Sequence, residues 1–359
     1  MTRAGRRLAV AALLAAAAGR GAAQVPTPEP RPDSSRGLRA REVAALFRTD
    51  SVLDVTIRTD LRGLFGDRDT LRAVWRAGTI TWPGPDSELT APLDLRTRGM
   101  YRLRQCEIPP IRLRFADSLV RGTPWRNLRR PKLVSACFDR DNYEQYVLEE
   151  YAIYQVLRLF TPISYAARLL RVTYRDVQDR RRPFTRYAFV TEDPDRFARR
   201  IGAAQVETTV GAFLPRLDQE YYALLAVFQY FIGNTDWSVP GHHNIALYRV
   251  AGATYGVPYD FDWSGVISAP YARPAPQLPI NQVSERIYRG YCGQPDEVLE
   301  PVLARFEALR DSIADIYRRL SSLQPRNLER TLRYYDEFYR RIADRQHFYR
   351  TVVARDCLR

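Results

Sequence analysis

The chain has 359 residues, of which 45% are hydrophobic and 27% are charged, a composition typical of a folded globular protein and unlike that of a disordered chain. Its formal net charge of +14 favours an anionic partner, so we expect a nucleotide together with a protein or an anionic substrate of the cell envelope. Nucleic acid is not expected, because the sequence has no recognisable nucleic-acid-binding module.

The N-terminal segment has the pattern of a secretory signal peptide. Arg3, Arg6 and Arg7 form a basic region, residues 8–18 an apolar region, and the small residues at 21–23 a cleavage site. We therefore predict export to the periplasm or the extracellular space. The later apolar runs are too short to cross a bilayer, so no transmembrane segment is expected.

Strands are expected to dominate the part of the chain that follows. A Pro- and Ser-rich linker over 24–36 precedes a short predicted helix at 39–47. Apolar residues with helical spacing predict one long helix over 143–160. Alternating or β-branched segments predict strands at 52–58, 79–82, 92–97, 111–115, 132–138, 169–174 and 184–191.

Helices are expected to dominate the rest of the chain. Residues 192–195 break the pattern and are interpreted as a hinge. Apolar stripes at helical spacing predict helices over 219–232, 302–320 and 328–342. The Pro-rich segment 269–279 is interpreted as an ordered loop near the functional site.

These patterns predict an α+β protein with four parts. They are a signal peptide over 1–23, a linker with a short helix over 24–50, a β-rich N-terminal lobe over 51–192 and a mainly helical C-terminal lobe over 193–359. We find no internal repeats and expect a monomer.

Four cysteines in an exported chain predict two disulfides. Three pairings are possible. We favour Cys106–Cys137, which joins two strands of the N-terminal lobe, and Cys292–Cys357, which attaches the C-terminus to the middle of the C-terminal lobe. A metal site is disfavoured because no two cysteines have close Cys-x-x-Cys spacing.

Three polar residues follow apolar runs in the second half of the chain. Asp236 comes first, Asn244 follows after a short loop, and Asp260 follows after one strand. Carboxylates at the ends of buried elements rarely lie there without a function. An aspartate can hold or deprotonate an acceptor hydroxyl, while an asparagine and a second aspartate can hold Mg²⁺ against nucleotide phosphates. The order predicts a kinase-type phosphoryl-transfer site.

The chain has a single lysine. Lys and Arg total 55, and 54 of them are arginine, so Lys132 marks a position where arginine does not fit. It begins a predicted buried strand, and the helix that follows contains Glu149 and Glu150. A compact ammonium that reaches phosphates and pairs with a helix glutamate suits this order.

Together these motifs resemble those of the CotH kinase family, the secreted or spore-coat atypical kinases, and they cover the chain from about residue 52 to the C-terminus. The resemblance implies an atypical protein-kinase-like two-lobed fold with a β-rich N-lobe and a mainly helical C-lobe. It also implies transfer of the ATP γ-phosphate to Ser or Thr hydroxyls of a protein, with Mg²⁺. The matching segments are 96–99 with Arg102, 106–115, Lys132, the helix with Glu150, 231–237, 243–244 and 258–265.

The resemblance gives the polar residues roles. Asp236 matches the catalytic aspartate, and Asn244 and Asp260 match metal-binding positions. Asp262 is an additional acidic neighbour, which either binds a second metal or accepts backbone hydrogen bonds at a turn. Lys132 matches the phosphate-contacting lysine.

The same resemblance makes Glu150 the ion-pair partner of Lys132. The sequence departs from the usual kinase pattern, because no Gly-x-Gly-x-x-Gly loop precedes Lys132 and Asn234-Thr235 replaces the His-Arg before the catalytic aspartate. The nearby Arg96, Arg98 and Arg102 are expected to brace the sheet or to contact an acidic ligand, not to catalyse.

Two alternative functions stay open. A catalytically inactive kinase-fold protein would bind or organise components of the extracellular or envelope space, and the missing glycine-rich loop favours it. A metallohydrolase would use His242, His243, Asp260 and Asp262, but adjacent histidines point in different directions in most backbones.

Overall fold

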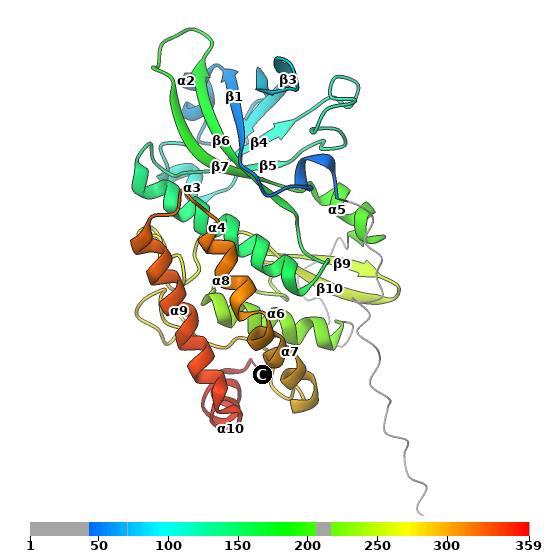
Figure 1. Ribbon diagram of the computed structural model, residues 1–359, viewed down its shortest axis with the longest axis vertical. Helices are drawn as coiled ribbons and strands as arrows, with labels where there is room; N and C mark the ends of the chain where they lie inside the picture. The colour runs from blue at the N-terminus through cyan, green and yellow to red at the C-terminus, as the bar shows by residue number, and fades with distance from the viewer. Residues whose placement is uncertain (1–42, 70, 206–216, 359) are drawn as a thin grey trace, which may run out of the picture. The chain divides into compact units, whose positions relative to one another are not determined.

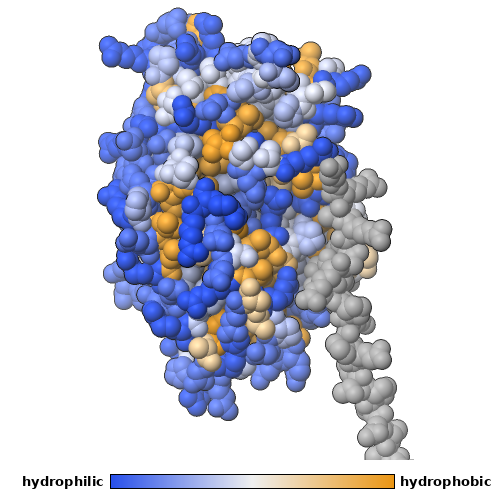
Figure 2. Space-filling view, in the orientation of Figure 1, coloured by the Kyte–Doolittle hydropathy of each residue, from blue (hydrophilic) through white to orange (hydrophobic). Residues whose placement is uncertain are grey.

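The computed structural model describes residues 43–69, 71–205 and 217–358. The predicted signal peptide and the linker over 24–36 lie outside the described residues. The described residues all belong to one compact unit. Hydrophilic residues cover most of the face drawn in Figure 2, where apolar residues gather in separate patches.

Seven strands form a closed barrel in the order β1-β2-β3-β4-β5-β7-β6 (Figure 1). All neighbours pair antiparallel except β1 and β6, whose parallel pairing from Leu53↔Leu170 to Thr59↔Asp176 closes the barrel. The strands are β1 (Leu53–Thr59), β2 (Arg76–Pro83), β3 (Glu88–Thr97), β4 (Ile111–Arg114), β5 (Lys132–Ser135), β6 (Ala167–Asp176) and β7 (Phe184–Thr191).

The predicted protein-kinase-like two-lobed fold is wrong. The strands close into a mixed barrel instead of forming the sheet of an N-lobe, and the helices lie mostly in the C-terminal part. The cause is the parallel contact between β1 and β6, which are far apart in sequence, and local alternation of residues carries no signal for such a contact. In addition, Val134, Leu169 and Phe189 of the barrel share one continuous apolar core with the C-terminal helices.

The helices and a second, small sheet complete the unit. The sheet has the order β10-β9-β8, with β8 (Ala204–Gln205), β9 (Ile245–Val250) and β10 (Ala253–Pro258). The helices are α2 (Leu61–Gly66), α3 (Tyr101–Gln105), α4 (Asp141–Phe160), α5 (Pro194–Ile201), α6 (Gln219–Ile232), α7 (Asp296–Ala308), α8 (Arg310–Arg318), α9 (Pro325–Ala343), α10 (Arg345–Phe348) and α11 (Ala354–Asp356), with short helical turns η1 (Ala45–Phe47) and η3 (Tyr349–Val353).

Most local predictions are confirmed. Each of the seven strands expected before residue 192 has its counterpart in the barrel, and β7 and α6 have the predicted bounds. The stripe over 302–320 is divided between α7 and α8. The predicted helix at 39–47 is reduced, among the described residues, to the three-residue turn η1.

The segment interpreted as a hinge is the start of helix α5. The side chain of Asp193 caps the helix by accepting hydrogen bonds from the N–H groups of Asp195 and Arg196, and Pro194 occupies the first turn. The neighbouring Glu192 is buried and forms a 2.9 Å ion pair with Arg200, which is also buried. Capping residues and a charged pair therefore explain the break in the apolar pattern.

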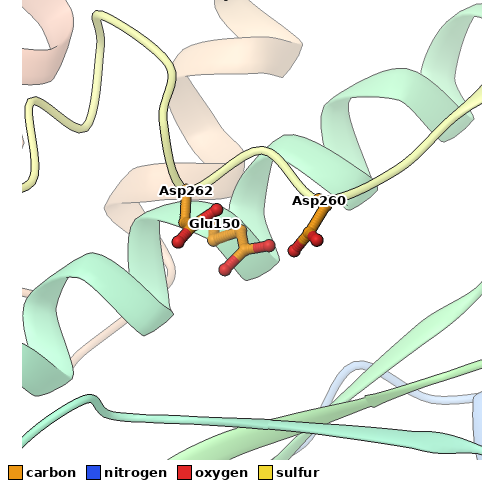
Figure 3. A group of neighbouring side chains, drawn as sticks. All are labelled: Glu150, Asp260 and Asp262. Atoms are coloured by element: carbon orange, nitrogen blue, oxygen red, sulfur yellow. The ribbon is translucent and has the colours of Figure 1, made fainter. Parts of the chain in front are cut away.

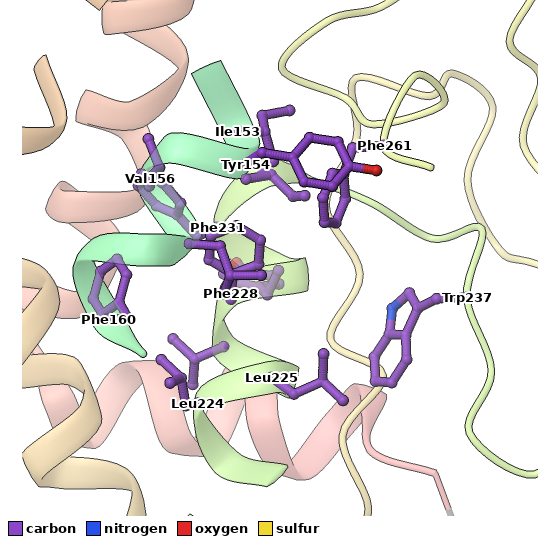
Figure 4. Packing of buried hydrophobic residues seen from close by; sticks show 14 of the residues in the cluster. Ile153, Tyr154, Val156, Phe160, Leu224, Leu225, Phe228, Phe231, Trp237 and Phe261 are labelled. Carbon is purple, nitrogen blue, oxygen red and sulfur yellow. The ribbon is translucent and has the colours of Figure 1, made fainter. Parts of the chain in front are cut away.

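Helix α4 lies in the core between the barrel and the C-terminal helices (Figure 1). Every residue from 147 to 157 is buried, which is the expected state of a helix that is apolar on most sides. Figure 4 shows its inner residues packed against α6, where the rings of Phe160 and Phe228 lie 6.4 Å apart. This burial also encloses two acidic residues, Glu149 and Glu150.

Both favoured disulfides are confirmed. Cys106 pairs with Cys137 at a Cα–Cα distance of 4.5 Å, and Cys292 pairs with Cys357 at 5.0 Å. Disulfides persist in oxidising compartments, so both are consistent with the predicted export. None of the helices in the described part of the chain has the length and apolar character needed to span a membrane.

A glycine pair gives a test of this packing. Gly233 and Gly202 end α6 and α5 with nearly the same backbone angles, φ 66° and 67°. A Cβ atom on Gly202 meets nothing within 4 Å, whereas a Cβ on Gly233 would lie 1.8 Å from the hydroxyl oxygen of Tyr334, whose ring lies under the Arg286 guanidinium. We expect Gly202→Ala to cost about 1–2 kcal/mol and Gly233→Ala to cost about 1–3 kcal/mol more.

Thermal or denaturant unfolding of both variants measures this difference. Adding Tyr334→Phe to Gly233→Ala removes the colliding hydroxyl, which has no hydrogen-bond partner in the described chain, and should restore part of the stability. Equal losses for the two glycine variants would contradict the packing described around Gly233.

Candidate functional site

The small β9–β10 hairpin brings two predicted site residues together. Because the strands are antiparallel, the start of β9 and the end of β10 meet, with Ile245 opposite Pro258. Asn244 precedes β9 and Asp260 follows β10, so both lie at this end of the hairpin. The N–H of Tyr259 donates a 3.0 Å hydrogen bond to the carbonyl oxygen of Asn244 and continues the pairing.

Asp236 lies beside Asn244. Its Oδ1 is 2.8 Å from Nε2 of His243, and its Oδ2 accepts a 2.9 Å hydrogen bond from Nδ2 of Asn244. The loop that carries Asp236 follows the α6 cap at Gly233 and is held by Asn234, whose Oδ1 accepts from the Asp236 N–H. Asn244 has a φ of 51°, a left-handed conformation that asparagine adopts more readily than most residues.

Three carboxylates converge from α4 and from the loop after β10 (Figure 3). Glu150, Asp260 and Asp262 each offer one oxygen atom, and these oxygens lie within 4.8 Å of one another. The N–H of Phe261 donates to Oε1 of Glu150 at 3.2 Å, and the N–H of Asp260 donates to the hydroxyl of Tyr154 at 3.0 Å. We call Glu150, Asp260 and Asp262 the acidic triad.

The buried ring of Phe261 positions the two aspartates. It is fully buried and packs at 4.9 Å from the ring of Tyr154 and at 6.0 Å from that of Phe228 (Figure 4). With the middle residue of Asp260-Phe261-Asp262 anchored in the core, the flanking carboxylates lie at the surface of that core beside α4. In Asp260-Phe261-Asp262, the buried ring of Phe261 therefore fixes the positions of the two carboxylates that flank it.

Burial makes the acidic triad electrostatically unfavourable without a cation. Burial raises the pKa of Glu150 well above its usual range, and the neighbouring Asp262 and Asp260 raise it further. Burial likewise raises the pKa of Asp262 to about 6, although Arg102 opposes the shift. Oδ2 of Asp262 is buried, has no hydrogen bond among the described residues and lies 3.7 Å from Nη1 of Arg102.

The acidic triad suits a hard divalent cation. Mg²⁺ and Ca²⁺ are bound in proteins by carboxylate and amide oxygens, which Glu150, Asp260, Asp262 and the nearby Asn244 supply. Arg102 compensates Asp262 in part, whereas Glu150 and Asp260 form no ion pair with any described residue, and a buried carboxylate without a cation is costly. The residues present therefore fit such an ion.

Lys132 lies beside the triad but is not paired directly with it. Its Nζ lies 4.1 Å from the centre of the Tyr259 ring, and no ion pair joins Lys132 to Glu150. Burial lowers the pKa of Lys132 to about 7, Arg98 lowers it further, and Asp260 and Glu150 oppose the shift. Glu150 thus belongs to the acidic triad and acts on Lys132 across a distance.

Two residues of the site were not assigned a role in catalysis or metal binding from the sequence. Arg102 lies in α3, donates to the carbonyl oxygen of Ser135 and approaches Asp262. Tyr271 is half-buried next to Asp262 and Arg102, and it belongs to the Pro-rich segment that was expected near the site. The Pro-rich composition was the signal for the loop, but no local pattern marks which of its side chains points inward.

No family model and no curated protein matches the sequence. The resemblance to the CotH kinase family therefore remains a proposal based on the motifs quoted above.

The raised pKa of Asp262 predicts a pH effect on stability. Its ordinary pKa is 3.8 and its folded value is about 6, so between these pH values the folded protein retains a proton that the unfolded chain has lost. This group's contribution to the free energy of unfolding should fall by about 2–3 kcal/mol as the pH rises through that window, and should be constant above it.

Chemical unfolding of the metal-free protein at pH 4 to 7 measures the effect. Asp262→Asn should reduce the fall, whereas Asp117→Asn, on a 59% exposed side chain, should leave it unchanged. A divalent cation should restore stability increasingly above pH 6. The same pH dependence in Asp262→Asn and in the wild type would contradict the described environment.

Proposed function

We propose that the protein is an exported Mg²⁺-dependent kinase that transfers the γ-phosphate of ATP to Ser or Thr hydroxyls of a protein. The observation that carries this proposal is the convergence, at one end of the β9–β10 hairpin, of three groups. They are the acidic triad, the chain's only lysine and the hydrogen-bonded pair Asp236–Asn244. The motifs that resemble the CotH kinase family support the same activity.

The acidic triad and Asn244 are the proposed metal ligands. The Nδ2 of Asn244 is occupied by two acceptors of Asp236, the backbone carbonyl and Oδ2, so its carbonyl oxygen is the side-chain atom left for a ligand. A Mg²⁺ ion bound there would neutralise the negative charge of the phosphates. Glu150 thereby takes a metal-binding role in place of the direct pairing with Lys132 that the resemblance implied.

Asp236 is the proposed catalytic aspartate. It accepts the proton of the acceptor hydroxyl as the oxygen attacks the γ-phosphorus; the new P–O bond forms as the bond to the leaving ADP breaks. His243 and Asn244 hold the carboxylate in place. Lys132 orients the phosphates, and their negative charge favours its protonated form against the effect of burial.

A binding or structural protein of the envelope is the second candidate. The observation in its favour is that both oxygens of Asp236 already have partners in His243 and Asn244, as in a structural polar network. This candidate requires neither a metal nor a nucleotide. The two experiments below separate it from the kinase.

Asp236→Asn tests the catalytic role. The amide keeps the size of the side chain but cannot accept a proton, so phosphoryl transfer should fall by about 10²-fold or more. Transfer is measured with labelled ATP and Mg²⁺, both as self-phosphorylation and with casein as a general acceptor. A folded Asp236→Asn protein that transfers phosphate as well as the wild type would contradict the proposal.

Two adjacent glutamates of α4 test the metal site. Glu150 and Glu149 are 1% and 0% exposed, but Glu149 points to the other side of the helix, where Arg330 and Thr331 donate to it. We expect Glu150→Gln to weaken Mg²⁺ binding by about tenfold or more, because one anionic ligand is lost.

Glu149→Gln is the matched control, since it makes the same chemical change on the same helix. It should lower the melting temperature, because its buried hydrogen bonds with charged partners weaken, and should leave Mg²⁺ affinity unchanged. Calorimetric titration with Mg²⁺, alone and with ATP, gives both affinities. Equal Mg²⁺ affinities in Glu150→Gln and the wild type would exclude the acidic triad as the metal site.

A further inference from the structure

Three basic side chains lie in a row across three neighbouring barrel strands. Arg96 of β3 is directly opposite Arg112 of β4, and Arg112 is directly opposite Lys132 of β5. Neighbouring strands are about 4.8 Å apart, so the row spans about 10 Å. Like charges directly opposite each other in a sheet are destabilising, so a row of this kind requires a reason.

The row faces the candidate site. Along β3, β4 and β5 these residues alternate with Leu95, Leu113 and Leu133, which are fully buried in the barrel's own core. Side chains alternate between the two faces of a strand, so the row lies on the outer face of the barrel. Val134, two residues after Lys132, packs on that same face into the core that contains α4.

A fourth cation extends the row. The N–H of Arg98 donates to the carbonyl oxygen of Pro110, which continues the pairing of β3 with β4 and places Arg98 two residues beyond Arg96 on the same face. Arg98 is also the charged neighbour that lowers the pKa of Lys132 most. We call Arg96, Arg98, Arg112 and Lys132 the basic row.

Among the described residues, carboxylates act on the basic row only across a distance, as Asp260 and Glu150 do on Lys132. The Nε atoms of Arg96, Arg98 and Arg112 are buried and lack a hydrogen-bond partner among the described residues, which also contain no ion-pair carboxylate for these three arginines. Asp193 acts on Arg112 from a distance, but its oxygens accept backbone N–H groups. The absence of an ion pair among the described residues leaves the positive charge of these three arginines available to an anionic ligand.

Arg114 provides the contrast. It lies on the same strand and the same face as Arg112, two residues further on, but its Nη2 is 2.7 Å from Oδ2 of Asp94. The Trp75 ring does not distinguish the two groups, because the guanidinium groups of Arg114 and Arg96 lie 4.3 Å and 4.9 Å from its centre. The chain therefore neutralises an arginine on this face where a ligand is not needed.

We propose that the basic row binds the phosphoanhydride chain of the phosphoryl donor, with the Lys132 end next to the acidic triad. A row of guanidinium groups suits such a chain, because each can donate two parallel hydrogen bonds to phosphate oxygens. This inference rests on the proposed function, and it supplies the phosphate-binding part that the absent glycine-rich loop would provide. Nucleoside triphosphates and inorganic polyphosphate share this chemistry.

Binding measurements with the mature chain test the proposal. The probes are inorganic tripolyphosphate, ATP and AMP, each with and without Mg²⁺, at fixed salt concentration. We expect tripolyphosphate to bind the wild type, and Arg112→Gln to weaken this binding by about tenfold or more, the loss expected for one charge-assisted contact to phosphate. Arg114→Gln removes the same charge from the same face and should leave the affinity unchanged.

Stability distinguishes a ligand site from a structural brace. If the basic row binds a ligand, Arg112→Gln relieves repulsion, so the melting temperature of the ligand-free protein should stay the same or rise. Arg96→Gln serves as a second variant and should weaken tripolyphosphate binding in the same way. Unchanged tripolyphosphate affinity in both variants, or a lower melting temperature in Arg112→Gln with no change in affinity, would overturn the proposal.

The same titrations separate this inference from the kinase activity and identify the donor. Tripolyphosphate binding that depends on Arg112, in a protein that transfers no phosphate from ATP, would support the basic row and contradict the kinase. Phosphoryl transfer from ATP that is unchanged in Arg112→Gln would support the kinase and contradict the basic row. If ATP binds much more tightly than tripolyphosphate, the donor is a nucleotide. If ATP and tripolyphosphate bind with equal affinity and AMP does not bind, the donor is inorganic polyphosphate. Both outcomes support the basic row.

Discussion

Helix α4 is buried on all sides over residues 147–157, and the positions of the other elements depend on this burial. The barrel covers one side of the helix and the C-terminal helices cover the other, so two consecutive glutamates enter a region from which water is largely excluded. On one side, Arg330, Asn327 and Thr331 all donate to Oε1 of Glu149, while its Oε2 is buried without a hydrogen-bond partner among the described residues. On the other, Glu150 meets two further carboxylates. A buried charge must be paired or must bind an ion, so the same helix carries a structural acid and a functional one.

The candidate site separates opposite charges across a short distance. The acidic triad lies on the α4 side and the basic row lies on the barrel side, with Lys132 at the end of the row and over the ring of Tyr259. A ligand that carries both a metal ion and phosphates would contact both groups at once. In the absence of such a ligand each group is destabilising, since like charges lie close together within each of them. The arrangement therefore indicates that binding and stability are linked at this site.

Local sequence signals predicted the elements well and the architecture poorly. Apolar alternation located the barrel strands, and the Asp193-Pro194 pair contains the standard signals of a helix start, although it was interpreted as a hinge. The closure of the barrel depends on pairing between β1 and β6, for which no residue near either strand gives a signal. The order Asp236, Asn244, Asp260 was enough to predict a cluster, because a hairpin joins its last two members. The convergence of Glu150 with Asp262, and of Arg96 with Arg112, depends on tertiary contacts.

The disulfide Cys106–Cys137 joins the two ends of the segment that contains β4 and β5, the barrel strands with the shortest pairing. Strand β4 has four residues and is paired with β5 at only two positions, one of which joins Arg112 to Lys132. Cys106 precedes β4 and Cys137 follows β5, so the bond encloses both strands in one covalent ring. Backbone hydrogen bonds from Leu113 to Pro131 and from Ile108 to Cys137 continue the pairing beyond these two positions. Without the disulfide, this segment would have greater conformational freedom in the unfolded chain. The alignment of an arginine with the single lysine is thus linked to the oxidation state of the compartment in which the chain folds.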